Sequence, residues 1–200
     1  MAIEAPMWIY WLFCLAATIP IIVKRSFAYQ LLSPDSESSR EGTGYKISLF
    51  LGWATTLLAA VVYILFTVKH ETGPYQLWDL ILFSLLNGTL EQFMFIFWFL
   101  VGCYLGQRFF QKRPIRVFVF GYVSYALYSG LIHPFFWFRV LPAHDPFTPV
   151  APILAFMSIF WMWLLWRHRS VISIISMHIF MDFLAIGHLH FGWFEPFQLV

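Results

Sequence analysis

The sequence predicts an all-α membrane protein, a single helix bundle with about six transmembrane helices. Of its 200 residues, 60% are hydrophobic, 22% are aromatic and only 11% are charged. A soluble domain could not bury so much apolar surface. Because a bilayer core about 30 Å thick needs about 20 apolar residues per helix, the chain has room for these spans in one domain, residues 1–200. No run shows the alternating pattern of a transmembrane barrel.

Six apolar runs carry almost no charge, and each is expected to form a helix because lipid cannot satisfy an exposed backbone. These runs cover residues 7–23, 47–68, 77–106, 117–138, 150–166 and 171–189. The third run would form a helix about 45 Å long, which is too long for one upright span. We therefore expect a break at Asn87 and Gly88, preceded by an interfacial or re-entrant piece over residues 76–86.

The first run is predicted to be a span rather than a cleaved signal peptide, because Glu4 precedes it and no basic residue does. Segment 33–44 is rich in Ser, Pro, Asp, Glu and Gly and is predicted to be a cytoplasmic loop. Cys14 and Cys103 lie inside apolar runs, where we expect them to pack as small hydrophobic side chains.

Basic residues cluster in alternate loops, and the positive-inside rule assigns such loops to the cytoplasm. The clusters are Lys24 and Arg25, then Arg108, Lys112, Arg113 and Arg116, then Arg167 and Arg169. This pattern predicts that both termini lie outside. The formal net charge is only +2, so no nucleic-acid partner is expected.

Four ionisable residues lie within or at the ends of the apolar runs, where a charge is costly without a partner or a function. Glu91 has Asn87 four residues before it, and His133 has Ser129 four residues before it. His178 and Asp182 are also four residues apart, so they share one helix face and the carboxylate can orient the imidazole. One carboxylate and two imidazoles can together activate water and stabilise an oxyanion.

Other readings of these residues remain open. Membrane histidines often hydrogen-bond neighbouring helices, and Glu91, His133, His178 and Asp182 are suitable ligands for a metal or haem. Dense aromatic stretches are expected to form interfacial belts; they include Phe135, Phe136, Trp137, Phe138, Trp161, Trp163 and Trp166. His188 and His190 are expected to be solvated, and His168 to belong to a basic turn. His144 and Asp145 lie in a Pro-rich loop that can gate access.

Three stretches together resemble the motifs of the CAAX prenyl protease and bacteriocin-processing (CPBP, or ABI) family of intramembrane glutamate proteases. They read Glu91-Gln92-Phe93-Met94-Phe95, Ser129-Gly130-Leu131-Ile132-His133 and His178-Ile179-Phe180-Met181-Asp182. The family motifs are Glu-Glu-x-x-x-Arg, Gly-Leu-x-His and His-x-x-x-Asn. The resemblance covers residues 89–186, about half of the chain, as a CPBP-like catalytic core.

The resemblance implies an endopeptidase in which Glu91 activates water and His133 and His178 are the essential histidines. Asp182 stands in place of the family's Asn, Gln92 in place of its second glutamate and Ile96 in place of its arginine. The second glutamate and the arginine of the family motif are therefore both absent. Their joint loss is energetically reasonable, because either one alone would be a buried unpaired charge.

From the residues and the resemblance together, we expect Asn87, Ser129 and Gln92 to contact the substrate or its oxyanion. No cofactor is expected, although a metal at Glu91, His133 and His178 stays open. The expected substrate is a CAAX-type or precursor peptide or protein entering from the membrane, in the plasma (inner) membrane of a prokaryote. The alternative is a catalytically silent scaffold or binding subunit of a membrane complex.

Overall fold

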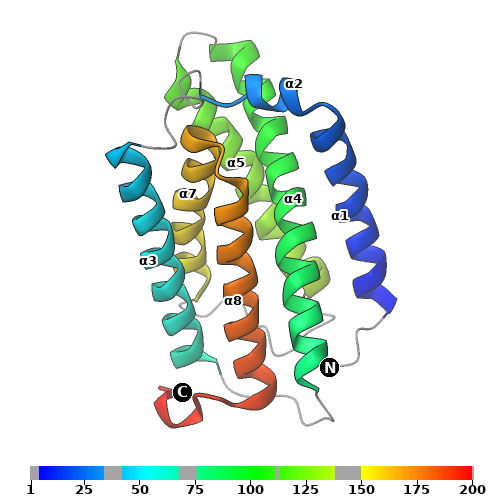
Figure 1. The fold of residues 1–200 in the computed structure, drawn as a ribbon, viewed down its shortest axis with the longest axis vertical. Coiled ribbons are helices and arrows are strands. Elements are labelled where there is room, and N and C mark those ends of the chain that lie inside the picture. Colours follow the sequence, from blue (N-terminus) through cyan, green and yellow to red (C-terminus); the bar gives the residue numbers. More distant parts are fainter. Residues whose placement is uncertain (1–4, 34–41, 68–75, 111–112, 138–149, 200) are drawn as a thin grey trace.

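The computed structural model describes residues 5–33, 42–67, 76–110, 113–137 and 150–199, and every element within them is helical. The elements are α1 (Ala5–Val23), α2 (Arg25–Gln30), α3 (Thr43–Phe66), α4 (Leu77–Phe110), α5 (Pro114–Ile132), η2 (His133–Trp137), α7 (Val150–His168), α8 (Val171–Phe191) and η3 (Glu195–Phe197). Six helices, counting α5 with η2 as one, are long and apolar enough to cross a membrane. The predicted six-span bundle is confirmed (Figure 1).

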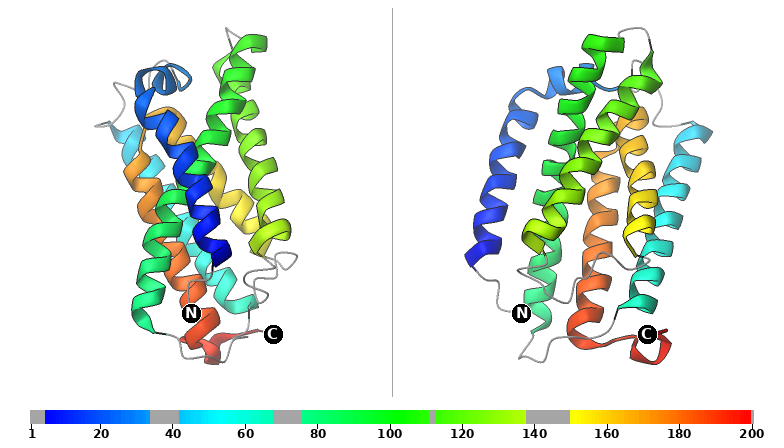
Figure 2. Two further views of the ribbon diagram at one scale, coloured as in Figure 1. Left: turned by 90° about the vertical axis from the view of Figure 1, so that its right-hand side faces the viewer. Right: turned by 180° about the vertical axis from the view of Figure 1, so that it is seen from behind.

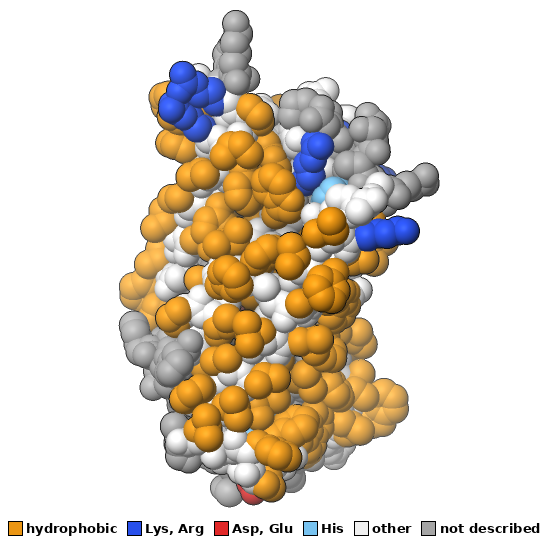
Figure 3. Space-filling view, turned by 90° about the vertical axis from the view of Figure 1, so that its left-hand side faces the viewer, with side chains coloured by type: hydrophobic (Ala, Val, Ile, Leu, Met, Phe, Trp, Pro, Cys, Tyr) orange, Lys and Arg blue, Asp and Glu red, His pale blue; other side chains and the backbone are white. Residues whose placement is uncertain are grey.

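The outer surface of the bundle is largely apolar, as expected for a lipid-facing protein (Figure 3). Every Lys and Arg that the structure describes lies at one end of the bundle, where α1, α4 and α7 end and α3, α5 and α8 begin. The start of α1 and the end of α8 both lie toward the opposite end (Figure 1). The chain is therefore an integral, multi-pass membrane protein with one strongly basic end.

Local sequence explains where two of these helices begin and end. Pro114 opens α5, where its missing N–H is not needed because the first turn of a helix leaves its amides unpaired. Gly192 ends α8 with a φ of 63°, a left-handed conformation that favours glycine, and its N–H donates to the His188 carbonyl at 2.9 Å.

The long helix α4 is continuous, so the break predicted at Asn87 and Gly88 is wrong. All 34 residues from Leu77 to Phe110 are helical, and α4 packs against α1, α5 and α8 (Figure 2). Gly88 is needed instead for close packing, since a Cβ there would lie only 2.6 Å from the backbone nitrogen of Ile179 on α8. The glycine is therefore the point where two helix backbones meet.

A second close approach joins α4 to α5. A Cβ on Gly121 would lie 2.6 Å from Cys103 Sγ, and one on Gly102 would clash with the carbonyl oxygen of Phe120. Cys103 and Cys14 are both free thiols with no exposed surface, which confirms that they pack as small hydrophobic side chains.

The end of α5 widens into the π-helical turn η2. Pro134 lies in this turn, and a proline inside a helix has no N–H to donate and crowds the carbonyl four residues earlier. A wider turn relieves that conflict, and such turns are frequent at functional sites. It also brings Trp137 back toward the interior of the bundle, where the side chain is 4% exposed.

Several side chains expected at the membrane interfaces are buried instead. Trp137, Trp161 and Trp166 belong to the core, so the predicted interfacial belt is wrong for these three, whereas Phe135 is exposed. Trp161 is drawn inward because its Nε1 donates to Thr56 Oγ1 on α3 at 2.9 Å. An indole has one polar atom, and burial is favourable once that atom has a partner.

The three other histidines that the structure describes, His168, His188 and His190, are also buried, although His188 and His190 were expected to be solvated. His168 is packed against Tyr45, with its Nε2 hydrogen-bonded to Ser48 Oγ at 3.1 Å. His188 and His190 lie in the core, and His188 Nε2 contacts the carbonyl oxygen of Thr67 at 3.1 Å. His144, Asp145 and most of the loop over residues 33–44 lie outside the described residues.

Candidate active site

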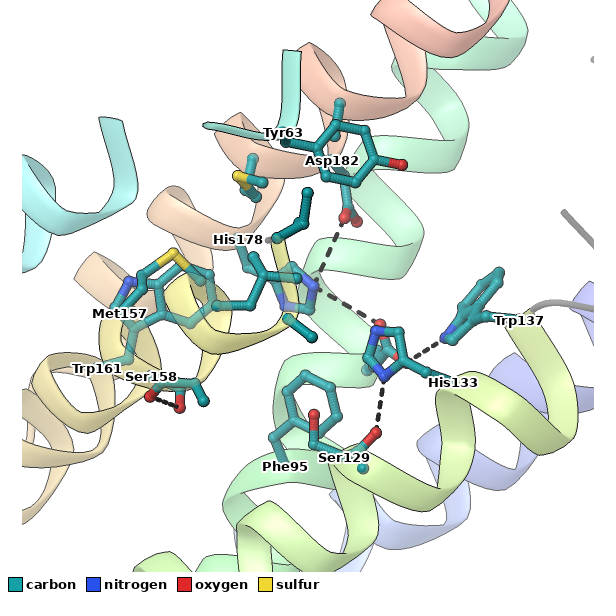
Figure 4. A pocket seen from close by; sticks show the side chains of 18 of the residues that line it. Tyr63, Phe95, Ser129, His133, Trp137, Met157, Ser158, Trp161, His178 and Asp182 are labelled. Carbon is teal, nitrogen blue, oxygen red and sulfur yellow. Dashed lines mark hydrogen bonds and ion pairs between the residues drawn. The ribbon is translucent and has the colours of Figure 1, made fainter. Parts of the chain in front are cut away.

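A cavity of about 320 Å³ lies between α3, α4, α5, η2, α7 and α8 (Figure 4). Its wall is mainly apolar and aromatic, with a small number of polar side chains. These are Asn87, Glu91, Ser129, His133, Ser158, His178 and Asp182, together with the phenols Tyr63, Tyr122 and Tyr125. Glu91, His133, His178 and Asp182, which come from three separate stretches of sequence, therefore meet at one cavity.

Glu91 projects from the middle of α4 and is 3% exposed. Its Oε1 accepts hydrogen bonds from the Tyr10 hydroxyl at 2.6 Å and from Trp137 Nε1 at 2.8 Å. Its Oε2 accepts one from Asn87 Nδ2 at 3.0 Å. Three donors stabilise a negative charge on this carboxylate in a place where the surrounding lipid cannot.

Asn87 links the two carboxylates of the site. Its Nδ2 donates to Glu91 Oε2 at 3.0 Å and to Asp182 Oδ2 at 2.9 Å, while its Oδ1 accepts from Trp11 Nε1 at 3.0 Å. Because an amide has only two N–H hydrogens, both are already used. The amide therefore holds Glu91 and Asp182 in place, and its hydrogens are not directed at a substrate oxyanion.

His178 projects from α8 between the two carboxylates. Its Nε2 lies 3.6 Å from Glu91 Oε2 and 3.6 Å from Asp182 Oδ1. Both distances are too long for direct hydrogen bonds, and a water molecule to one side of these three atoms can contact all of them. Phe95 stacks on the imidazole ring at 5.6 Å between centroids, so the ring is held in one plane.

Gln92 and Ile96 lie behind the cavity wall rather than in it. Gln92 is fully buried, and its Oε1 is hydrogen-bonded to His178 Nδ1 at 3.1 Å, so it fixes the orientation of the imidazole. Its amide nitrogen has no hydrogen-bond partner among the described residues. Ile96 is 2% exposed and packs in the core. Both side chains are uncharged, so neither leaves an unpaired charge in the interior of the bundle.

His133 lies at the end of α5, where η2 begins, and lines the same cavity as His178 (Figure 4). Its Nδ1 contacts the Ser129 carbonyl oxygen at 2.7 Å. A carbonyl can only accept, so Nδ1 carries the hydrogen and Nε2 of the neutral ring carries none. The Ser129 residue therefore positions His133 through its backbone.

Four aromatic residues contribute to the site although the sequence analysis predicted no such role for them. They are Tyr10, Trp11, Tyr128 and Trp137. Tyr10 and Trp11 come from α1, where an aromatic residue in an apolar run is indistinguishable from one that faces lipid. The Tyr10 hydroxyl also lies 3.1 Å from the Tyr128 hydroxyl. For Trp137 a signal existed, because it follows His133 by four residues and so shares its helix face.

Metal-binding geometry is not found in the described part of the chain, where no three His, Cys, Asp or Glu side chains are grouped to hold an ion. Comparison with known proteins gives no match to a family model, a curated protein or a solved structure.

Proposed function

We propose that the protein is a CPBP-like intramembrane endopeptidase that hydrolyses a peptide bond with water activated by Glu91. The observation that supports this best is the convergence of Glu91, His178 and Asp182, with His178 Nε2 equidistant, at 3.6 Å, from an oxygen of each carboxylate. The substrate is a membrane-embedded peptide or protein, and the compartment is the plasma membrane of a prokaryote, with the basic end in the cytoplasm.

The two oxygens of Glu91 have different tasks in this mechanism. Oε1 is held by Tyr10 and Trp137, whereas Oε2 lies beside His178 and takes the proton of the attacking water. The water oxygen adds to the scissile carbonyl carbon, and the oxygen of that carbonyl becomes an oxyanion. When the tetrahedral intermediate collapses, the C–N bond breaks and the amine leaves with the proton from Glu91.

The histidines are the candidates for stabilising the oxyanion. His133 can do so when its ring is protonated, because Nδ1 is committed to the Ser129 carbonyl and Nε2–H is then a directed donor. Asp182 and Gln92 act on His178, the first through its charge and the second through a hydrogen bond to Nδ1. No serine or cysteine nucleophile is needed.

One observation favours the alternative, a catalytically silent scaffold. The hydrogen bonds to Glu91 connect α1, α4 and η2, and Asn87 extends the network to α8. A network with this many cross-links stabilises a bundle whether or not it does chemistry. The two functions differ in what they require of Glu91, since a scaffold needs its oxygens and an enzyme needs its basicity.

The test replaces Glu91 with Gln and measures cleavage of a library of quenched-fluorescent hydrophobic peptides by the purified full-length chain in lipid nanodiscs. We expect about a hundredfold slower cleavage, equivalent to about 2.7 kcal/mol of barrier. The matched control is Glu195→Gln, which changes the same atoms on an exposed residue of η3 and leaves the rate unchanged.

Thermal unfolding of both variants separates a catalytic loss from a folding loss. A folded Glu91→Gln variant that cleaves at the native rate contradicts the assignment of the base. If the unaltered protein is folded and cleaves no peptide of the library, the scaffold becomes the better account.

A further inference from the structure

The cavity carries an excess of negative groups. Glu91 and Asp182 both lie 3.6 Å from Nε2 of the His178 imidazole, and none of the described residues that line the cavity is Lys or Arg. The only bases among the described lining residues are His133 and His178, and each is a cation only when its ring takes up a proton. The negative charge of the two carboxylates is therefore balanced either by protons, on the carboxylates or on the imidazoles, or by a cationic ligand.

Asp182 is the carboxylate more open to a ligand. Its side chain is 15% exposed, compared with 4% for Glu91 and 8% for His178. Asn87 donates one hydrogen to Asp182 Oδ2, and among the described residues the polar contact of Oδ1 is the one at 3.6 Å with His178 Nε2. Both lone pairs of Oδ1 can therefore accept from a ligand, because a carboxylate oxygen accepts more than one hydrogen bond.

The wall around the carboxylates is aromatic. Tyr63 from α3 lies beside Asp182 (Figure 4), and the other aromatic residues of the lining are Phe83, Phe95, Tyr122, Tyr125, Trp137 and Trp161. Ring faces carry partial negative charge, so they attract cations, most strongly where water is excluded. Aromatic rings and a carboxylate in one enclosed space are the combination that binds ammonium groups.

From this combination we infer that the cavity binds an organic cation, with its ammonium group against Asp182 and its apolar part against the aromatic rings. A volume of about 320 Å³ is at the lower end of the range for small-molecule pockets and admits an amine the size of a lysine side chain. The inference rests on the proposed function only in its further statement that the cation belongs to the substrate, next to the bond that is cleaved.

The test compares benzylammonium with benzyl alcohol, which has nearly the same shape and no charge. Binding of each to the full-length protein in nanodiscs is measured by isothermal titration calorimetry and by quenching of tryptophan fluorescence, since Trp137 and Trp161 line the cavity. We expect benzylammonium to bind at least about tenfold more tightly than the alcohol, a difference of about 1.4 kcal/mol.

Asp182→Asn removes the charge and keeps the oxygen that accepts from Asn87. We expect this variant to lose the preference for benzylammonium and to bind benzyl alcohol as before, while Glu195→Gln keeps the preference. Equal binding of the two probes by the unaltered protein overturns the inference even if the variant does not fold. A preference that persists in folded Asp182→Asn overturns it as well.

Cleavage is measured separately, so the two proposals can fail independently. Preferential ammonium binding by a protein that cleaves no peptide supports the cation site and contradicts the endopeptidase. Cleavage without any ammonium preference supports the endopeptidase and contradicts the cation site.

Discussion

Gly88→Ala tests whether the close contact between α4 and α8 positions the site. The new Cβ would lie 2.6 Å from Ile179 N, whereas ordinary contact begins at 3.4 Å, so α8 must move by the difference, about 0.8 Å. Ile179 directly follows His178, so the imidazole moves with it. The obstacle is backbone rather than a flexible side chain, so it cannot simply rotate away.

A displacement of about 1 Å in a catalytic group can reduce a rate about a hundredfold. Overpacking of this kind also lowers the free energy of unfolding by about 1–3 kcal/mol. We therefore expect Gly88→Ala to unfold at a lower temperature and to cleave the peptide library much more slowly. Gly44→Ala is the control, because it places the same Cβ on a helix with nothing within 4 Å.

The assays are differential scanning fluorimetry and the peptide-cleavage assay, both in nanodiscs. A Gly88→Ala protein with native melting temperature and native rate would refute the reasoning, since α8 would then tolerate the shift. Loss in both Gly88→Ala and Gly44→Ala would point to a general effect of alanine rather than to the helix contact.

Three further outcomes are expected. Tyr10→Phe removes a donor from Glu91 and should lower the free energy of unfolding by about 1–3 kcal/mol, measured by denaturation, whereas an unchanged value would mean that the hydroxyl contributes nothing. Ile115→Cys, at an exposed position on the basic end, should react with an impermeant thiol reagent only from the cytoplasmic side of inverted vesicles. Labelling of Ile115→Cys from outside intact cells would contradict the predicted orientation. The native Cys14 and Cys103 are buried and should not react. Metal chelators should leave peptide cleavage unchanged, and restoration of lost activity by an added ion would contradict this.

The number of spans and their approximate limits could be predicted because apolar runs in lipid must be helical. The course of α4 could not, because a glycine that breaks a helix and one that admits a neighbouring backbone look the same in sequence. Gly88 is of the second kind, and only the position of Ile179 shows it. Packing between helices determines which of the two roles a glycine has, and the periodicity of the sequence does not indicate that packing.

The sequence could also indicate the central residues of the candidate site, because Glu91, His178 and Asp182 are polar groups inside apolar runs, and the structure places them at one cavity. It did not indicate how these residues are supported. In the sequence, Trp137 looks like an interfacial aromatic residue. In the structure it lies in the π-helical turn, and its Nε1 is 2.8 Å from Glu91 Oε1. The hydrogen bonds that Asn87 and Gln92 make to other members of the site were not predicted, since both residues were considered only as contacts for a substrate. Which partner a buried polar group finds depends on the fold.

The length of α4 has a mechanical consequence. At about 1.5 Å per residue, its 34 residues extend about 51 Å, well beyond a hydrocarbon core of about 30 Å, while the 19 residues of α7 nearly match that core. Bilayers of different thickness should therefore tilt α4, as hydrophobic mismatch usually does. Glu91 lies near the midpoint of α4. When the helix tilts about its middle, the carboxylate is therefore displaced less than the two helix ends are.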